Sequence, residues 1–282
     1  MRAAIVMPTY EEAGNISVVL PRVRAAAPDA DVLVVDDASP DGTADLAEAV
    51  GREAGRVTVM RRSGPRGFGA ACRAGFGWAV DGGYDVVVGM DADLSHDPDA
   101  LPSLLAAVEE GADLVVGSRY VPGGAIPNWP VHRRALSRWG NRYATALLRL
   151  PVSDATSGYR AYRSSMLRRI SLDRQRANGY GFLIEMVYRV AQQGGTVVEV
   201  PIVFVDRERD GSKMSGRIVV EAMALVTLWG LRDLARRLAP ARRRRPLRLR
   251  TGEKRQGGGG ASPARPPEHD PTRPNGVSEA NE

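Results

Sequence analysis

Short apolar runs alternate with longer amphipathic stretches along most of the chain. The runs are rich in valine and nearly free of charge; they are Ala3–Met7, Val32–Val35, Val57–Met60, Val86–Met90, Leu114–Val116 and Val197–Val200. Continuous apolar runs of this length are typical of strands in a parallel sheet that is covered on both faces. We therefore expect these segments to form one buried sheet.

The amphipathic stretches predict helices. They are Asn15–Ala27, Thr43–Ala54, Ala70–Val80, Ala100–Glu110, Arg133–Leu150, Gly181–Gln193 and Ser215–Leu238. Strands that alternate with helices predict an α/β fold, with a Rossmann-like, mostly parallel sheet between helices and further helices at the C-terminal end. The stretch Val121–Pro130 contains three prolines and two glycines, so we expect a loop there.

The apolar pattern stops at Ala239. A cationic run, Arg242–Arg245, is followed by the glycine run Gly257–Gly260 and by a stretch rich in proline, serine and glutamate. Such a composition buries too little apolar surface to order itself. The sequence therefore predicts one domain over residues 1–238 and a basic, then low-complexity, disordered tail over 239–282.

Charge and cysteine content exclude several classes of function. The formal net charge is +6, but 12 of the 39 basic residues lie beyond residue 235, and the first 235 residues carry 27 basic and 28 acidic residues. A neutral body of this kind argues against nucleic acid as a partner. The single cysteine, Cys72, excludes an internal disulfide and a thiolate zinc site. No signal-peptide pattern precedes the first strand, so we expect a cytoplasmic setting.

The longest apolar run, Ile218–Leu231, is interrupted by Glu221. As a helix it would measure about 21 Å, which is short of the roughly 30 Å of a hydrocarbon core. We interpret it as a buried or interfacial helix, and packing against the core is favoured over membrane contact.

Polar residues gather where the predicted strands end, which is where open parallel sheets bind ligands. Asp91 and Asp93 follow the fourth strand. In an extended chain their side chains point to the same side, so both carboxylates can face one Mg²⁺ or Mn²⁺ ion. The alternative is a solvated loop with helix-capping aspartates; the apolar strand before the pair and the acidic end of the second strand favour the metal site.

The second strand ends in Asp36 and Asp37, which are followed by a turn and a helix start. Capping by Asp41 and Thr43 is compatible with Asp37 facing a nucleotide base. The run Gly67-Phe68-Gly69 suggests a dinucleotide fingerprint, but its third glycine is replaced by Cys72. A tight turn close to a ligand is the better interpretation.

Together these motifs resemble the family-2, GT-A-fold glycosyltransferases, and among them the dolichol-phosphate or polyprenol-phosphate mannosyltransferases. The resemblance rests on five stretches and covers about residues 3–230: Pro8–Glu12, Asp36–Thr43, Asp91–His96, Gly117–Tyr120 and Asp154–Arg160, with Glu185, Val200–Arg207 and Ser212-Lys213 in support. It implies inverting transfer of mannose from GDP-mannose to a polyprenyl phosphate in the membrane.

The resemblance also implies roles for individual residues. Those expected to bind the sugar nucleotide are Pro8, Tyr10, Glu12, Val35, Asp37, Asp91, Ala92, Asp93, Arg119, Arg207 and Lys213. Asp91, Asp93 and Ser95 are expected to hold the Mg²⁺ or Mn²⁺ ion. Serine is a weak metal ligand, so water is expected to complete the coordination shell. Asp91, Asp93, Arg119 and Arg133 are expected to be catalytic.

Arginines suit this chemistry without the resemblance, because a diphosphate and a lipid phosphate together carry several negative charges. The alternatives are a surface ion pair for Arg119, a solvated helix face for Arg133 and a plain surface loop around Arg207. A phosphate acceptor needs no catalytic base, so Asp154 and Glu185 are expected to orient arginines or sugar hydroxyls.

Several alternatives remain at this stage. The same acceptor with UDP-glucose or another sugar nucleotide is the nearest one, and a non-catalytic membrane or nucleic-acid adaptor is a more distant one. Trp129 fits a lipid interface and ordinary packing equally well. Many relatives carry transmembrane helices that this chain lacks, so we expect a peripheral protein at the inner face of the membrane and a possible anchoring partner protein.

Overall fold

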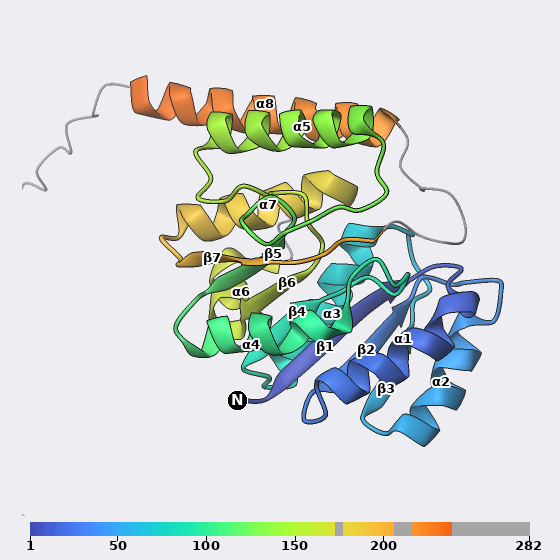
Figure 1. Cartoon of the computed structure of the whole chain (residues 1–282). Helices are drawn as coiled ribbons and strands as arrows, with labels where there is room; N and C mark the ends of the chain where they lie inside the picture. The colour runs from blue at the N-terminus through green and yellow to red at the C-terminus, as the bar shows by residue number, and fades with distance from the viewer. Residues whose placement is uncertain (173–176, 206–215, 239–282) are drawn as a thin grey trace, which may run out of the picture. The chain divides into compact units, whose positions relative to one another are not determined.

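The computed structural model describes residues 1–172, 177–205 and 216–238. Within these ranges one seven-stranded sheet forms the centre of the molecule (Figure 1). Its strands are β1 (Ala3–Thr9), β2 (Asp31–Asp36), β3 (Val57–Arg61), β4 (Val86–Gly89), β5 (Leu114–Ser118), β6 (Arg160–Arg163) and β7 (Val197–Pro201). Their order is β3-β2-β1-β4-β6-β5-β7, and β6 runs antiparallel to both of its neighbours. The mostly parallel sheet of the sequence prediction is confirmed.

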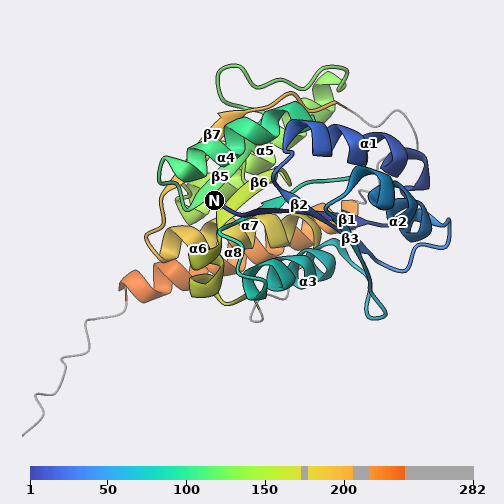
Figure 2. The same ribbon diagram turned by 90° about the horizontal axis from the view of Figure 1, so that it is seen from below.

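Helices cover both faces of the sheet (Figure 2). The helices α1 (Ala13–Ala26), α2 (Thr43–Ala54) and α4 (Leu101–Glu109) lie on one face, and α3 (Phe68–Asp81), α6 (Ser164–Ile170) and α7 (Gly179–Gln192) lie on the other. A short 3₁₀ turn, Pro98–Ala100, precedes α4. Helices α5 (Val131–Leu148) and α8 (Gly216–Leu238) lie side by side, and α8 also packs on α7 (Figure 1).

The alternation of side chains along the central strands divides the core in two. In β1, Ala4 and Val6 pack beneath α3 and α7, whereas Ile5 and Met7 pack beneath α1 and α4. All four are fully or almost fully buried, because both faces of the strand are covered. This burial explains the continuous apolar runs that made the strands visible in the sequence.

Two elements are absent from the sequence prediction. Strand β6 and helix α6 form from a segment in which arginines interrupt the apolar pattern. Arg160 is nevertheless fully buried in β6, where its guanidinium donates to the carbonyl oxygens of Leu183 and Ala155 at 2.6 and 2.7 Å. The tail from Ala239 lies outside the described residues, so the domain boundary at 238 remains a prediction.

Helix α8 differs from the expected core-packed helix. Val226 is fully buried, but Leu228, Leu231 and Leu234 are 43, 58 and 52% exposed. One side of the helix therefore packs on the body while an apolar side faces outward. Among the described helices, none combines the length and the apolar character needed to cross a bilayer.

Candidate active site

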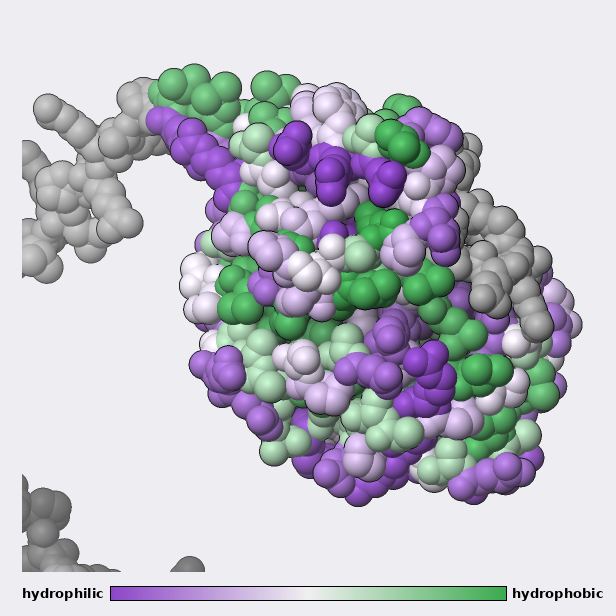
Figure 3. Space-filling view, viewed as in Figure 1, coloured by the Kyte–Doolittle hydropathy of each residue, from purple (hydrophilic) through white to green (hydrophobic). Residues whose placement is uncertain are grey.

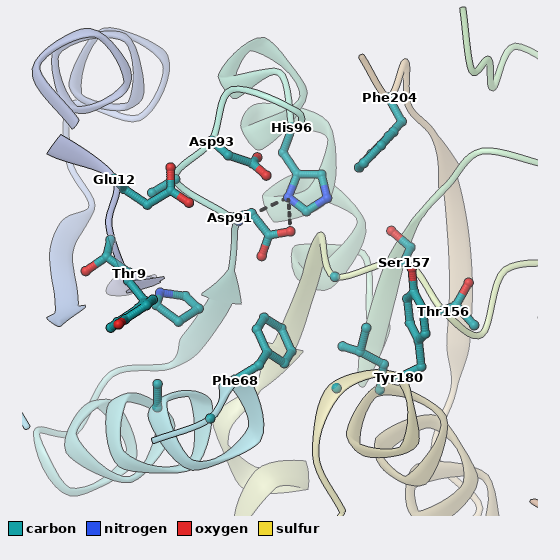
Figure 4. Close-up of a pocket in the computed structure, with 18 of the residues that line it drawn as sticks. Thr9, Glu12, Phe68, Asp91, Asp93, His96, Thr156, Ser157, Tyr180 and Phe204 are labelled. Atoms are coloured by element: carbon teal, nitrogen blue, oxygen red, sulfur yellow. Dashed lines mark hydrogen bonds and ion pairs between the residues drawn. The ribbon is translucent and has the colours of Figure 1, made fainter. Parts of the chain in front are cut away.

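A cavity of about 550 Å³ opens at the carboxyl ends of β1, β2, β4 and β5. Figure 4 shows Thr9, Glu12, Asp91 and Asp93 on one side of it, with Thr156, Ser157 and Tyr180 across from them. The parallel strands end at this edge of the sheet, so the polar loops that follow them come together there.

The cavity brings together most of the side chains that the sequence singled out. They are Pro8, Tyr10, Glu12, Asp37, Asp91, Ala92, Asp93, Arg119 and Arg133. Val35 and Ser95 are not among its lining residues. Val35 is fully buried in the core beneath α3, and Ser95 lies 1% exposed beside Asp93. Arg207 and Lys213 lie outside the described residues.

The loop after β4 holds its two aspartates in place by local hydrogen bonds. Asp93 accepts hydrogen bonds from the backbone N–H of Ser95, at 3.0 Å, and from its hydroxyl. The backbone between them turns through Leu94, which has a φ of 63°. This turn leaves Asp93 only 5% exposed while it lines the cavity. Ser95 therefore orients Asp93, and its expected role as a metal ligand stays a prediction.

His96 holds the backbone of Asp91 in place through a hydrogen bond. Its Nδ1 accepts a hydrogen bond of 3.1 Å from the backbone N–H of Asp91 and lies 3.9 Å from the Asp91 carboxylate (Figure 4). The ring stacks on Tyr159 with centroids 4.9 Å apart and is 1% exposed. His96 therefore forms a structural hydrogen bond within this loop.

The end of β2 places Asp37 in the wall of the cavity. Its carboxylate accepts hydrogen bonds from the guanidinium of Arg62 and, at 2.6 Å, from the backbone N–H of Gly67. Gly67 has a φ of 147°, which favours glycine, so this N–H reaches Asp37 through a tight turn. Gly67 thus forms the turn beside the cavity that the sequence favours, and Phe68 and Gly69 begin α3.

Arg66, in the same turn, contacts Tyr10. The sequence does not reveal this contact. The Arg66 guanidinium lies 4.9 Å from the ring centroid of Tyr10 and donates to the Tyr10 hydroxyl at 3.0 Å. It also donates to the carbonyl of Ala38 at 3.1 Å. Arg66 therefore ties the loops after β1 and β2 to the turn before α3.

A buried ion pair stands at the end of β5. The Nε and Nη2 atoms of Arg119 each donate to one oxygen of Asp154 at 2.7 Å, and Nη2 also donates to Thr156 Oγ1 at 2.8 Å. Burial alone would raise the pKa of Asp154, but the Arg119 guanidinium outweighs it and holds this pKa below its ordinary value. Burial would lower the pKa of Arg119. The Asp154 carboxylate outweighs burial and holds this pKa above its ordinary value.

The arrangement answers two questions left by the sequence. Arg119 is not a surface ion pair, because it is 5% exposed and lines the cavity. Asp154 and Glu185 both contact arginines, since Glu185 accepts from Arg189 at 2.6 Å. Glu199 in β7 supports Asp154 further by accepting the backbone N–H groups of Ser153 and Asp154 at 2.7 and 3.0 Å.

Known proteins resemble the chain in sequence. The family model of glycosyl transferase family 2 matches residues 4–171. The chain belongs to this family. It is therefore a glycosyltransferase, as the sequence motifs indicate, and the adaptor alternative falls away.

Curated relatives of this glycosyltransferase cover most of its length. An undecaprenyl-phosphate mannosyltransferase of Micrococcus luteus is 52% identical over 82% of this chain and 95% of the relative. A polyprenol monophosphomannose synthase of Mycolicibacterium smegmatis is 48% identical over 82% of this chain and 88% of the relative. The resemblance to the polyprenol-phosphate mannosyltransferases is thus confirmed.

Solved structures confirm the GT-A fold. A glucosyl-3-phosphoglycerate synthase of Mycobacterium tuberculosis, in complex with Mn²⁺, UDP-glucose and phosphoglyceric acid, has a TM-score of 0.63 at 19% identity. The match covers 81% of this chain and 79% of that chain. At this identity the likeness concerns the fold alone.

The residues of the glycosyltransferase cavity fit a divalent cation bound together with a ligand. Carboxylate oxygens are the donors that Mg²⁺ and Mn²⁺ prefer, and Asp91 and Asp93 both line the cavity. Within the described part of the chain, no group of three or more histidine, cysteine, aspartate or glutamate side chains forms a closed metal cage. Two carboxylates leave coordination positions for diphosphate oxygens and water.

Several lining residues escape the sequence analysis. Phe68, Thr156, Ser157, Tyr180 and Phe204 all face the cavity (Figure 4). Thr156, Ser157 and Phe204 lie in stretches that the sequence marks only through the family resemblance, which assigns them no role. Phe204 reaches the cavity because β7, which it follows, pairs with β5.

Proposed function

We propose that this glycosyltransferase transfers mannose from GDP-mannose to a polyprenyl phosphate, with inversion of the anomeric centre. The observation that carries the proposal is one cavity in which two carboxylates, Asp91 and Asp93, lie with two guanidinium groups, Arg119 and Arg133. Such a site can bind a metal-bound diphosphate and a second phosphate at once. Both relatives, an undecaprenyl-phosphate mannosyltransferase and a polyprenol monophosphomannose synthase, are named for polyprenyl-type acceptors.

Asp37 supports guanine as the base of the donor. A carboxylate accepts two parallel hydrogen bonds from the N1–H and the exocyclic amino group of guanine, whereas uracil offers a single N–H between two carbonyl groups. Asp37 is 6% exposed and is held by Arg62 and by Gly67 N–H, so its orientation is fixed before a ligand binds. Pro8, Tyr10 and Glu12 would complete the nucleoside end of the site.

The acceptor supplies its own nucleophile. A phosphate monoester has a second pKa near 6, so at pH 7.5 it is mainly the dianion. Its oxygen attacks the anomeric carbon opposite the leaving diphosphate, which inverts that centre. Arg119 and Arg133 would hold the acceptor phosphate in line. A Mg²⁺ or Mn²⁺ ion held by Asp91 and Asp93 would neutralise charge on the leaving GDP.

Asp154 and Glu185, the two candidates for a catalytic base, are both paired with arginines. Asp154 is engaged by Arg119 and Glu185 by Arg189. The bidentate contact with Arg119 depresses the pKa of Asp154, which makes this carboxylate a poor general base. The mechanism therefore assigns no proton transfer to either residue.

We also propose a peripheral position at the inner face of the membrane. The support is the α5–α8 surface, which consists of the exposed apolar side chains Val131, Leu136, Trp139, Val220, Leu228, Leu231, Leu234 and Leu238. The same helices carry exposed arginines, among them Arg134, Arg138 and Arg232. Figure 3 shows apolar and strongly polar residues side by side over these helices.

Apolar side chains bordered by arginines suit the headgroup region of an anionic leaflet, where each cation near the surface contributes about 1 kcal/mol. Arg133, in the first turn of α5, lines the cavity, and the same helix contributes Val131, Leu136 and Trp139 to this surface. A polyprenyl phosphate in that leaflet would thus have its phosphate near the site. An anchoring partner protein would act in addition to this surface.

A panel of sugar nucleotides tests the proposal. The purified full chain is incubated with Mn²⁺ or Mg²⁺, a short polyprenyl phosphate and, in turn, GDP-mannose, GDP-glucose, UDP-glucose and UDP-galactose. We expect lipid-linked sugar from GDP-mannose at a rate at least 100-fold above that from the others. Preferred turnover of UDP-glucose would replace the proposed donor by the nearest alternative.

A further inference from the structure

Trp129 lies close to both arginines of the cavity. It precedes α5 in the loop after β5, lines the cavity and is 7% exposed, so it packs inside the protein and does not face a lipid interface. The Cζ atom of Arg133 lies 4.0 Å from its ring centroid, and that of Arg119 lies 5.9 Å from the same centroid. One indole ring therefore contacts both guanidinium groups.

The ring is itself held firmly. Phe204 packs edge-on against Trp129 with centroids 5.8 Å apart and an interplanar angle of 83°. Phe204 also meets the ring of His96 edge-on at 5.6 Å, and His96 stacks on Tyr159. A row of aromatic rings thus runs from the loop that carries Asp91 to the indole, and it leaves the indole little freedom to move.

The two arginines differ in how the protein fixes them. Arg119 is anchored by two hydrogen bonds to the buried carboxylate of Asp154. Arg133 lies in the first turn of α5 and is only partly buried, and its guanidinium lies close over the Trp129 ring. Two cations on one wall repel each other, and an aromatic face offsets part of that repulsion because the ring quadrupole attracts both.

We propose that Trp129 is a positioning residue whose indole ring holds Arg133 beside Arg119 so that both bind one phosphate of the acceptor. The inference rests on the proposed function in one respect, namely that the acceptor phosphate binds at these two arginines. The face of the Trp129 ring then sets the affinity for that phosphate by positioning Arg133.

The indole N–H provides a competing explanation for an effect of Trp129 on phosphate affinity. Within the described part of the chain, Trp129 Nε1 is buried and has no hydrogen-bond partner. It could instead donate directly to a phosphate oxygen. Replacement by phenylalanine separates the two explanations, because it keeps an aromatic face and removes the N–H group.

The test measures binding of farnesyl phosphate, a short soluble polyprenyl phosphate, to the full chain by calorimetry. We expect Trp129→Leu to raise the Kd for farnesyl phosphate about tenfold and Trp129→Phe to raise it no more than threefold. The Kd for GDP with Mn²⁺ should stay within twofold of the parent in both variants. Trp78→Leu, which alters a tryptophan of α3 that does not line the cavity, serves as the matched control and should change neither value.

A double-mutant cycle then tests whether Trp129 acts through Arg133. In an Arg133→Gln background, Trp129→Leu should weaken binding by less than a further twofold, because the group that it positions is gone. Equal losses for Trp129→Phe and Trp129→Leu, full additivity in the cycle, or unchanged binding by Trp129→Leu would each overturn the proposal. A parent that binds farnesyl phosphate but transfers no mannose would refute the proposed function and leave this inference standing.

Discussion

Arg119 and Asp154 form a bidentate ion pair at the edge of the cavity, with both N···O distances at 2.7 Å and with the carboxylate fully buried. The pair holds the buried Arg119 guanidinium in the wall of the glycosyltransferase cavity. Thr156 extends it, since its hydroxyl accepts from Arg119 at 2.8 Å and from Asn141 of α5 at 3.0 Å. The guanidinium is thus placed by β5, by the loop before β6 and by α5 together.

Removing the carboxylate should destabilise the fold. Asp154→Asn leaves the buried Arg119 charge without its partner, and we expect the free energy of unfolding at pH 7 to fall by about 3–5 kcal/mol. The measurement is urea denaturation followed by circular dichroism. Glu48→Gln, which breaks a pair with the exposed Arg61 on the surface of α2, is the control and should change stability by less than about 1 kcal/mol.

The same variant should change the pH dependence of stability. The pKa of Asp154 is depressed in the folded state, so the pair's contribution is complete above the unfolded pKa of about 3.9 and is lost as the pH falls through the lower folded value. The difference in unfolding free energy between parent and Asp154→Asn should therefore narrow below pH 4. A difference that stays constant from pH 7 to pH 3 would show that the carboxylate's charge is not what stabilises the pair.

The proposed metal site depends on the carboxylates of the loop after β4. We expect Asp93→Asn to lower transfer by more than 100-fold, about 3 kcal/mol or more, while the far-ultraviolet spectrum stays that of the parent. Asp97→Asn is the matched control, because Asp97 lies in the same loop, contacts the exposed Arg22 and does not line the cavity. Transfer by Asp93→Asn within threefold of the parent at saturating Mn²⁺ would rule out the metal assignment.

The proposed mechanism, which uses no dedicated base, predicts a particular pH profile. The single-turnover rate should rise with pH through the acceptor's second pKa, near 6, and this acid limb should persist in Glu185→Gln and in any Asp154→Asn protein that retains activity. Each rate is measured by rapid quench from pH 5 to pH 9. If one substitution abolishes the limb and added formate or azide restores the rate, that carboxylate is the base and the mechanism is wrong.

The α5–α8 surface should govern attachment to membranes. Replacing Leu231 and Leu234 by glutamate puts two negative charges on an apolar, arginine-bordered face, and we expect sedimentation with anionic phospholipid vesicles to drop at least tenfold. Turnover of a detergent-soluble acceptor should stay within twofold of the parent. Leu46→Glu, at a 41% exposed position on α2, is the control. Undiminished vesicle binding by the double variant would exclude this surface as the docking face.

The sequence predicts the sheet well where strands are covered on both faces, because Val32–Val35 and Val86–Met90 consist almost wholly of apolar residues. It misses β6 because Arg160 and Arg163 break the pattern, and only the folded structure supplies the carbonyl oxygens that satisfy the buried Arg160. The aspartates of the site are visible because each follows an apolar strand. Trp129 and Phe204 are not, since their contact joins loops that follow β5 and β7 and depends on the pairing of those strands.

The anomeric configuration of the product tests the central claim most directly. The full chain is incubated with GDP-α-mannose, Mn²⁺ and a short polyprenyl phosphate, and the purified lipid is examined by the one-bond carbon–proton coupling of its anomeric carbon. The account predicts a single mannosyl phosphate product in the β configuration, as required by one in-line displacement by the acceptor phosphate. An α-linked product, or release of mannose and GDP with no mannosyl lipid, would contradict it.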